Sequence, residues 1–277
     1  MLSYQHIYHA GGWADLQKHA ALCALWDAMG REAASPKVRR TYIDTHSGRG
    51  AYDLGAVEAL KTAEFETGIA HLAPARLPKL LHPYGAALKF WTPLYPGSAG
   101  CIAALRRKGE EMALCELHPG EVKHLRQNLG RKPQVRIIQK NGHEAVIDAL
   151  PRDAAAQAAT LVLVDPSYEV KAEYAQTAQT ALHILERAPQ AKILIWYPVL
   201  AGAAHHEALL EGLSVPLKHG ALHSLMNAPG ETPPPKGMIR SGLILLNPPE
   251  GFAKGFDGVS ELLQRILSRG AGRRRRG

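Results

Sequence analysis

The sequence lacks the features of membrane-spanning and of disulfide-stabilised proteins. No apolar run approaches the roughly 18–20 residues needed to cross a bilayer, and the first residues lack the charged-then-apolar order of a secretory signal. The three cysteines, Cys23, Cys101 and Cys115, have neither metal-ligand nor redox spacing. We therefore expect a cytoplasmic protein with reduced cysteines, no metal site and no membrane partner.

Acidic residues are outnumbered by basic ones. The chain carries 33 Lys and Arg against 25 Asp and Glu, which gives a formal charge of +8. Four arginines lie at 273–276, and without them the formal charge falls from +8 to +4. An excess of this size is compatible with a polyanionic partner but does not identify one. We expect residues 271–277 to form a basic, disordered tail.

Short apolar runs alternate with helix-compatible segments along most of the chain. The runs are residues 41–44, 112–115, 135–139, 161–164 and 193–196. Runs that are apolar at nearly every position are typical of strands buried on both faces of a parallel sheet. Two more runs, 217–226 and 238–246, are separated by too few residues for a crossover helix, so we expect them to pair antiparallel. The pattern predicts an α/β fold with a doubly wound, mostly parallel, seven-stranded sheet.

One stretch interrupts this alternation. Residues 55–94 are rich in Ala, Leu and Pro, show helical patches and contain no evident strand. We interpret them as a small helical insertion. The main domain would then consist of residues 1–54 and 95–270.

Ligands of doubly wound sheets bind at the carboxyl ends of the strands, and the polar residues there are the candidate site. The first strand leads into a turn with Gly48 and Gly50, where the backbone can approach a nucleotide closely. A dinucleotide fingerprint would need a third glycine at Asp53, which argues against NAD. Glu116 follows the second strand and could accept hydrogen bonds from ribose hydroxyls. Its alternative interpretation is a solvated surface acid.

Two further strands end in polar motifs. Asn141 and Gly142 follow the third strand, where they could bind an adenine edge or form a simple turn. The fourth strand leads into Asp165, Pro166, Ser167 and Tyr168 (the letters DPSY). This segment resembles the Asp/Asn-Pro-Pro-Tyr/Phe motif of amino-methylating enzymes. The alternative is a purely structural role, in which the proline ends the strand and the aspartate caps the next helix.

The motif suits methylation of an aromatic amine, which is a poor nucleophile because its lone pair is delocalised. Asp165 and the Pro166 carbonyl can both accept hydrogen bonds from the amino group, which aims the lone pair and stabilises the developing charge. Tyr168 can stack on a base taken out of its helix. A similar run, NPPE at 247–250, lacks the aromatic residue and is interpreted as a strand terminator.

Nearly the whole chain is similar to the RlmJ family of 23S ribosomal RNA adenine-N6 methyltransferases. The most specific parts of the resemblance are His9-Ala10-Gly11, Ala14-Asp15 and Lys18-His19, and supporting parts are DTH at 44–46, YPGS at 95–98, ELHP at 116–119 and WYP at 196–198. The resemblance implies a Rossmann-like methyltransferase sheet that binds S-adenosylmethionine and acts, as a monomer, on 23S ribosomal RNA. It also implies that the helical insertion helps to hold RNA.

The resemblance assigns roles to particular residues. Its cofactor pocket matches Lys18, His19, His46, Ser98, Glu116, Asn141, Gly142 and Asp165. Asp165 also matches the catalytic acid, and Tyr4 matches a residue that contacts RNA, beside the substrate contacts expected of Pro166 and Tyr168. The chain departs from the family pattern at Ser167, where the family has proline, and at Asn141, where it has aspartate.

Other functions stay open at this level. The DPSY motif would also suit an adenine or guanine amino-methyltransferase acting on DNA or another RNA. A non-catalytic nucleic-acid-binding protein is a further alternative, against which the presence of Asp165 and Tyr168 argues.

Overall fold

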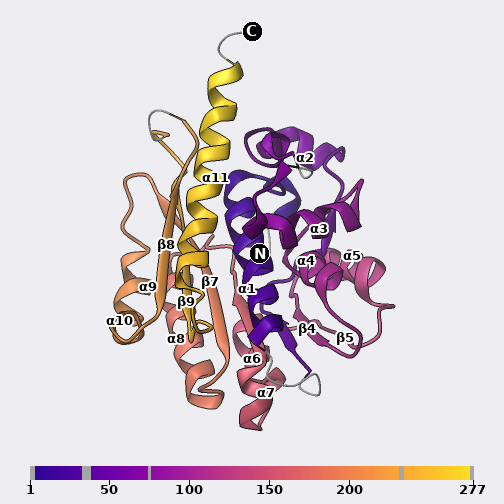
Figure 1. Cartoon of the computed structure of the whole chain (residues 1–277), viewed down its shortest axis with the longest axis vertical. Helices are drawn as coiled ribbons and strands as arrows, with labels where there is room; N and C mark the ends of the chain where they lie inside the picture. Colours follow the sequence, from indigo (N-terminus) through magenta and orange to yellow (C-terminus); the bar gives the residue numbers. More distant parts are fainter. Residues whose placement is uncertain (1–3, 33–38, 74–75, 231–233, 275–277) are drawn as a thin grey trace.

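The computed structural model describes residues 4–32, 39–73, 76–230 and 234–274, with side chains described up to residue 268 (Figure 1). Seven strands of this part form one sheet in the order β5-β4-β1-β6-β7-β9-β8. The strands are β1 (Thr41–Asp44), β4 (Glu111–Cys115), β5 (Val135–Ile138), β6 (Thr160–Val164), β7 (Lys192–Leu200), β8 (Leu222–Asn227) and β9 (Met238–Leu246). All neighbouring pairs are parallel except β7–β9 and β8–β9. The predicted fold class is confirmed.

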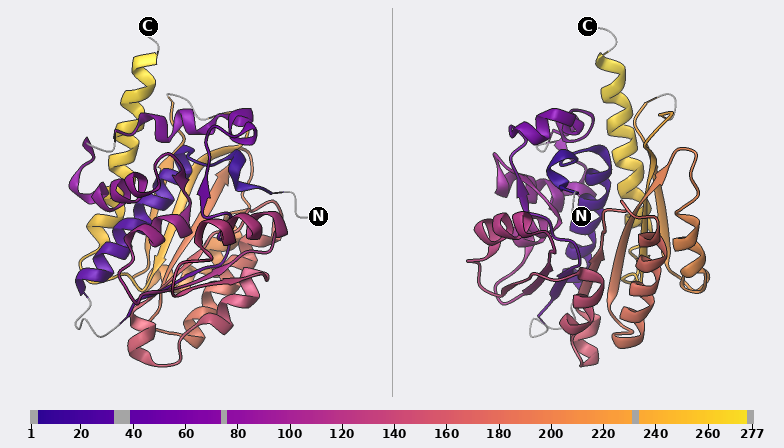
Figure 2. Two further views of the ribbon diagram at one scale, coloured as in Figure 1. Left: turned by 90° about the vertical axis from the view of Figure 1, so that its right-hand side faces the viewer. Right: turned by 180° about the vertical axis from the view of Figure 1, so that it is seen from behind.

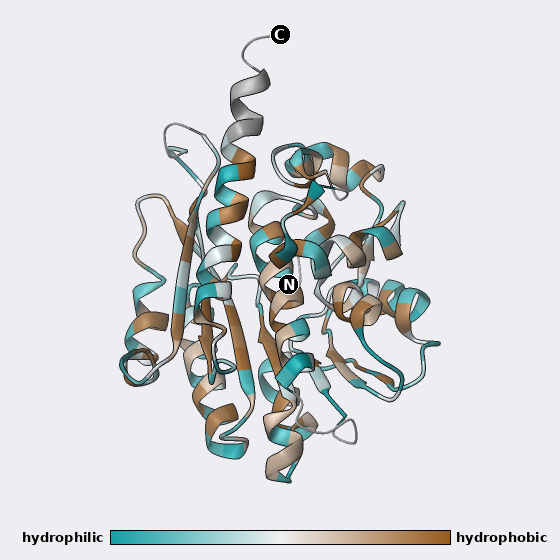
Figure 3. Ribbon diagram, viewed as in Figure 1, coloured by the Kyte–Doolittle hydropathy of each residue, from teal (hydrophilic) through white to brown (hydrophobic). Residues whose placement is uncertain are grey.

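Helices cover both faces of the sheet (Figures 1 and 2). One core contains side chains of α1 (Trp13–Glu32), α3 (His82–Trp91), α4 (Ser98–Leu105), α5 (Pro119–Leu129) and α11 (Ala253–Arg274). The opposite core contains side chains of α6 (Gly142–Ala149), α8 (Ala172–Arg187) and α9 (Glu207–Gly212). On β6, Leu161 and Leu163 enter the first core while Val162 and Val164 enter the second. This alternation of side chains explains why β6 is apolar from Leu161 to Val164. The brown strands of Figure 3 show the apolar character of the sheet.

The remaining elements are short. They are β2 (Ala51–Tyr52), β3 (Tyr95–Pro96), α2 (Val57–Thr62), α7 (Ala154–Ala158), α10 (Ser214–Lys218) and the 3-10 turns η1 (His6–Tyr8), η2 (Glu64–Thr67), η3 (Ile69–His71) and η5 (Lys79–Leu81). No helix within the described ranges is both long and apolar enough to cross a membrane.

The insertion between β2 and β3 contributes to the main core. β2 and β3 pair antiparallel and hold its two ends together. Leu81, Tyr84 and Leu88 from the insertion are buried in the same cluster as Leu16 and Leu22 of α1. The insertion therefore shares the core of the main domain and has no separate core among the described residues.

Helix α1 is buried on nearly all sides. Sixteen of its 20 residues are buried, among them Asp15, Lys18 and His19. It packs against α3, α4 and α11, and this position lets it present polar side chains to the interior of the molecule.

Two boundaries differ from the sequence-based expectation. The run that begins at Leu217 belongs first to α10, and β8 starts only at Leu222. At the carboxyl end, α11 continues to Arg274, which lies within the tail expected at 271–277. Residues 275–277 lie outside the described ranges.

Candidate active site

The predicted site residues converge on one cavity of about 440 Å³ at the carboxyl ends of β1, β4, β5 and β6. The residues expected to bind cofactor or substrate all line it: Tyr4, Lys18, His19, His46, Ser98, Glu116, Asn141, Gly142, Asp165, Pro166 and Tyr168. The expected strand terminator after β9 does not line this cavity. Asn247 instead donates its side-chain amide to the Pro189 and Ala191 carbonyls.

Glu116 connects the ends of the two neighbouring strands β1 and β4. Its carboxylate accepts hydrogen bonds from the Gly48 N–H on one oxygen and from the His118 N–H on the other, both at 2.8 Å. Gly48 has φ +55°, a conformation that favours glycine. Burial raises the pKa of Glu116 above its ordinary value. The backbone thus fixes the carboxylate, and each oxygen retains acceptor capacity for a hydroxyl group.

Asn141 has a structural role that the sequence left open. Its side-chain oxygen accepts from the His143 N–H at 3.0 Å and caps α6. A Cβ at Gly142 would lie 1.8 Å from the Thr45 carbonyl oxygen, so only glycine fits there. Asn141 is therefore the helix cap as well as part of the cavity wall.

Two neutral histidines line the same wall, with ring centroids 5.0 Å apart. The Thr180 hydroxyl donates to the Gln176 carbonyl, so it accepts from Nδ1–H of His143 at 2.9 Å. By the same reasoning Thr45 donates to Leu163 and accepts from Nδ1–H of His46. Burial lowers the pKa of His143 to about 4 and that of His46 to about 3. Both Nε2 atoms are consequently acceptors, and that of His143 has no partner among the described residues.

Asp44 lies behind the cavity and holds Ser98 in place. Its carboxylate accepts from the hydroxyls of Ser98 and Tyr42, each at 2.7 Å, and from the His46 N–H at 3.2 Å. The side chain is fully buried, and burial raises its pKa to about 6. Ser98, expected to contact the cofactor, is thereby oriented by a carboxylate that the sequence did not single out.

Replacing Asp44 with asparagine is expected to remove part of the pH dependence of stability. The folded pKa of about 6 exceeds the unfolded value of ~3.9. The stabilisation from proton uptake is therefore complete below pH ~4 and is lost as the pH rises through 6. In urea unfolding between pH 4 and 7.5, the wild type should lose about 2–3 kcal/mol more stability than Asp44→Asn. Identical pH profiles would show that this carboxyl group does not titrate in the range.

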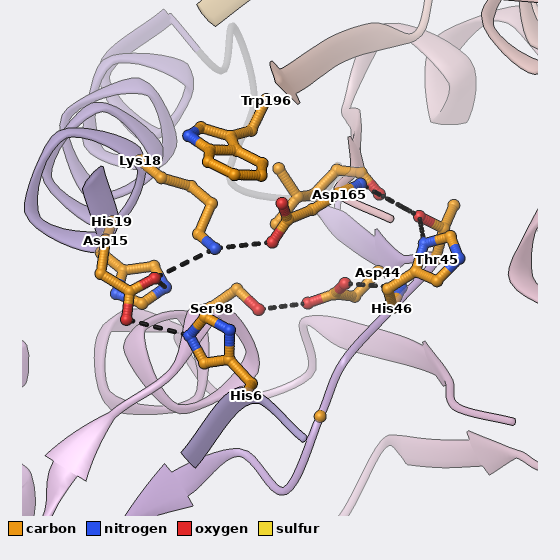
Figure 4. Close-up of polar contacts among 12 residues, drawn as sticks. His6, Asp15, Lys18, His19, Asp44, Thr45, His46, Ser98, Asp165 and Trp196 are labelled. Atoms are coloured by element: carbon orange, nitrogen blue, oxygen red, sulfur yellow. Dashed lines mark hydrogen bonds and ion pairs between the residues drawn. The ribbon is translucent and has the colours of Figure 1, made fainter. Parts of the chain in front are cut away.

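A chain of charged side chains crosses the cavity from α1 to the end of β6 (Figure 4). Lys18 Nζ lies 2.7 Å from Asp165 Oδ2 and 3.1 Å from Asp15 Oδ1. Asp15 also accepts from the Gly11 N–H and contacts His6 Nε2 at 2.9 Å. The side chains of Lys18 and Asp15 are each 4% exposed and that of Asp165 is 10% exposed. The ammonium group is thus shared between two carboxylates in a largely dry environment.

These contacts shift the pKa values of Asp165, Lys18 and Asp15. Burial raises the pKa of Asp165 above its ordinary value, and Lys18 opposes this shift. Burial disfavours the charge of Lys18, yet the two carboxylates hold its pKa above its usual value. Although burial acts against its charge, the pKa of Asp15 is held well below its usual range, chiefly by His6 and Lys18. Lys18 therefore favours the ionised form of Asp165.

His19 and Tyr4 also lie where the resemblance placed them, with partners that it did not name. His19 Nδ1 lies 2.9 Å from the Tyr95 hydroxyl, which is 3.1 Å from the hydroxyl of Tyr84 on α3. Burial lowers the pKa of His19 to about 3. The Tyr4 hydroxyl lies 2.8 Å from His6 Nδ1. Asp15, His6 and Tyr95 were missed as site residues. Asp15 belongs to the amino-terminal motif and Tyr95 to the YPGS segment, so these motifs could have indicated them, whereas no motif contained His6.

Tyr168 is packed inward. The residue is 7% exposed, and its backbone φ is +55°. Its ring centroid lies 4.4 Å from that of Tyr174, and its hydroxyl donates to the Trp196 carbonyl. It borders the cavity, so stacking on a base stays a prediction. Pro166 is buried beside it, and the Ser167 hydroxyl is 3.5 Å from Glu173.

The cavity is lined by far more negative than positive groups. Its carboxylates are Asp15, Glu64, Glu116, Glu121, Asp165, Glu169 and Glu173, and its one lysine is Lys18. This lining suits a ligand with cationic centres, such as a sulfonium and an ammonium group. Within the described ranges no group of three or more His, Cys, Asp or Glu side chains is arranged to hold a metal ion.

The fold and the cavity together define a Rossmann-like methyltransferase. The chain belongs to the family described as ribosomal RNA large subunit methyltransferase D, RlmJ, whose model matches residues 38–277. It is 29% identical over 255 residues to ribosomal RNA large subunit methyltransferase J of Escherichia coli and 30% identical over 263 residues to that of Haemophilus influenzae, in each case covering 90% of this chain and 88% of the relative. The crystal structure of protein LPL1258 from Legionella pneumophila superposes with a TM-score of 0.80 at 28% identity and 95% coverage of both chains.

Glu116→Ala is expected to weaken cofactor binding without changing RNA affinity. The carboxylate offers charged acceptors to hydroxyl groups, and a hydrogen bond to a charged group contributes about 1.5–3 kcal/mol, or roughly 10- to 100-fold in affinity. Calorimetric titration with S-adenosylhomocysteine measures this loss. Glu111→Ala, an exposed position on the same strand, is the matched control. Equal affinities of the two variants would remove Glu116 from the site.

Proposed function

We propose that this protein transfers the methyl group of S-adenosylmethionine to the N6 amino group of an adenine in 23S ribosomal RNA. The observation that carries the proposal is the Asp165 carboxylate, which is ion-paired to Lys18 and borders the cavity together with Pro166 and Tyr168. Family membership supports the ribosomal RNA substrate, because both curated relatives bear the name of large-subunit ribosomal RNA methyltransferases.

The polar wall of the cavity fits the cofactor. Glu116 would hold the ribose hydroxyls, while Asn141, Gly142 and His143 border the space for its adenine ring. The carboxylate-rich lining would favour its positive charges. When bound, S-adenosylmethionine supplies an electrophilic methyl group on a sulfonium. A cytoplasmic, monomeric protein is part of the same proposal.

The chemistry assigned to the chain is positioning and charge stabilisation. Asp165 Oδ and the Pro166 carbonyl would each accept a hydrogen bond from one N–H of the target amine. This arrangement would turn the nitrogen lone pair out of conjugation with the ring. The amine would become cationic as it takes the methyl group from the sulfonium, which leaves as a neutral thioether, and it would then lose a proton to the Asp165 carboxylate or to water. Preorganised acceptors of this kind act most strongly where water is excluded, and Lys18 keeps the carboxylate ionised.

Transfer of labelled methyl groups to deproteinised 23S RNA, followed by nucleoside analysis, tests the proposal. We expect N6-methyladenosine as the only labelled product. Label in guanine, or label that appears only with DNA, would contradict the substrate assignment. Failure to bind S-adenosylmethionine in calorimetry would favour a non-catalytic nucleic-acid-binding protein.

Ser167→Pro is expected to be tolerated, with turnover equal to or a few-fold above that of the wild type. Proline lacks an N–H and fixes φ near −65°, and no hydrogen bond from the Ser167 N–H is found in the described structure. Ser167→Pro also removes the hydroxyl contacts with Glu173 and with the Glu169 N–H, and both are weak at 3.5 Å. A single-turnover rate reduced tenfold or more, with an unchanged melting temperature, would show that serine is required.

A further inference from the structure

Two segments near the cavity contain only basic charges. Residues 82–109 and 122–140 have ten Lys and Arg and no Asp or Glu, although the whole chain has 25 acidic residues. The ten are Lys89, Arg106, Arg107, Lys108, Lys123, Arg126, Arg131, Lys132, Arg136 and Lys140. The cavity itself has the opposite charge, so phosphate groups flanking a bound base need a basic surface outside it.

Helix α5 leads from the cavity to the centre of this basic region. Glu121, in its first turn, lines the cavity and is ion-paired to Arg49. Lys123 and Arg126 lie on the exposed face of the helix, and Arg131 and Lys132 follow in the turn after it. The helix has 11 residues and is therefore roughly 16 Å long. Its basic face could thus follow a nucleic-acid strand for a few nucleotides.

An exposed aromatic ring lies at the far end of α5. Phe90 of α3 is 57% exposed and packs edge-on against Trp91, with ring centroids 5.7 Å apart. Lys132 Nζ lies 5.3 Å from the centroid of the Phe90 ring and 5.9 Å from that of Trp91. Trp91 is anchored by a hydrogen bond from its ring N–H to the Gly100 carbonyl at 2.8 Å. Phe90 is thereby held in place on the surface, beside a cation.

The cations of this region are available to an external anion. Lys123, Arg126, Arg131 and Lys132 form no ion pair with any residue that the structure describes. The first half of the helical insertion is different. It carries Glu58, Glu64 and Glu66 against Lys61, so only the α3 end of the insertion suits a polyanion. A basic track with an exposed aromatic ring is characteristic of surfaces that bind single-stranded nucleic acid.

We propose that Lys123, Arg126, Arg131, Lys132 and Phe90, here named the α5 surface, bind a single-stranded stretch of the RNA that flanks the target adenine. The four cations contact successive phosphates, and Phe90 stacks on an unpaired base. This proposal rests on the proposed function, since it takes the substrate to be RNA.

The test compares three proteins in binding and in turnover of deproteinised 23S RNA. The first variant replaces Lys123, Arg126, Arg131 and Lys132 with alanine. The second variant is Phe90→Ala. Lys218→Ala/Lys254→Ala, at exposed positions in α10 and α11, is the matched control. We expect the four-site variant to raise KM for RNA at least tenfold. Its log–log salt slope should fall by up to about 3, at ~0.7 per contact.

Phe90→Ala is expected to weaken RNA binding about fivefold or more with an unchanged salt slope, because stacking contributes about 1–3 kcal/mol per base. Both variants should keep the kcat of the control at saturating RNA and its affinity for S-adenosylhomocysteine. If the wild type methylates 23S RNA and the four-site variant has the RNA affinity and salt slope of the control, the proposal that the α5 surface binds RNA is wrong. Absence of methylation by the wild type would instead contradict the proposed function.

Discussion

Replacing Asp165 by alanine is expected to reduce methyl transfer by a hundredfold to a thousandfold while the protein stays folded. The carboxylate borders the cavity at the end of β6, directly before Pro166. Loss of an aimed electrostatic contact typically costs ~3–4 kcal/mol in the barrier, and 1.4 kcal/mol corresponds to tenfold in rate. Single-turnover transfer to 23S RNA measures the effect directly.

The control for this variant is Asp148→Ala, an exposed aspartate on α6. It should retain the wild-type rate. S-adenosylhomocysteine affinity, measured on both variants, separates a catalytic loss from a loss of cofactor. An Asp165→Ala enzyme with more than about a tenth of the wild-type rate would contradict the catalytic assignment.

Lys18→Met is expected to lower the rate at pH 7 by a similar factor and to change its dependence on pH. Burial raises the pKa of Asp165, and Lys18 opposes that shift. Without the ammonium group the pKa of Asp165 rises further, so a larger fraction of its carboxyl groups is protonated at neutral pH and fewer of them can accept a hydrogen bond from the amine. The ionised form returns as the pH increases, and the rate should recover on the alkaline side.

The pH–rate profile distinguishes this explanation from a simple loss of structure. We expect the acid limb of the Lys18→Met profile to move upward by more than one pH unit relative to wild type. Lys171→Met, an exposed lysine before α8, should leave the limb in place. A Lys18→Met profile that is reduced by the same factor at every pH would show that Lys18 does not control the charge of Asp165.

Much of the fold was predictable because the central strands contain runs that are apolar at nearly every position. Such strands identify a sheet with two covered faces, and the polar residues that follow them then fall at one edge. This is why Glu116, Asn141 and Asp165 could be placed in one site before their distances were known.

The contribution of α1 could not be derived in this way. Its hydrogen-bond and ion-pair partners are far away in sequence: Lys18 contacts Asp165 across 147 residues, and His19 contacts Tyr95 across 76. A helix that is buried on nearly all sides has no clear hydrophobic periodicity, so nothing local indicates which face carries polar groups. For these residues the resemblance to a family added what spacing could not. The inward packing of Tyr168 was also hidden, because it depends on Tyr174 and Trp196.

The hydrogen-bonded contact of His19, Tyr95 and Tyr84 has a consequence for the construction of chimeric enzymes. Tyr84 belongs to the insertion, and His19 to the wall of the cavity. Removing or exchanging residues 55–94 would take away Tyr84 and leave the buried Tyr95 hydroxyl with one partner fewer, at a cost of about 1–3 kcal/mol. It would also uncover the apolar side of α1. A transplant between family members must therefore carry α1, β3 and the insertion together, since these three segments form one unit of exchange.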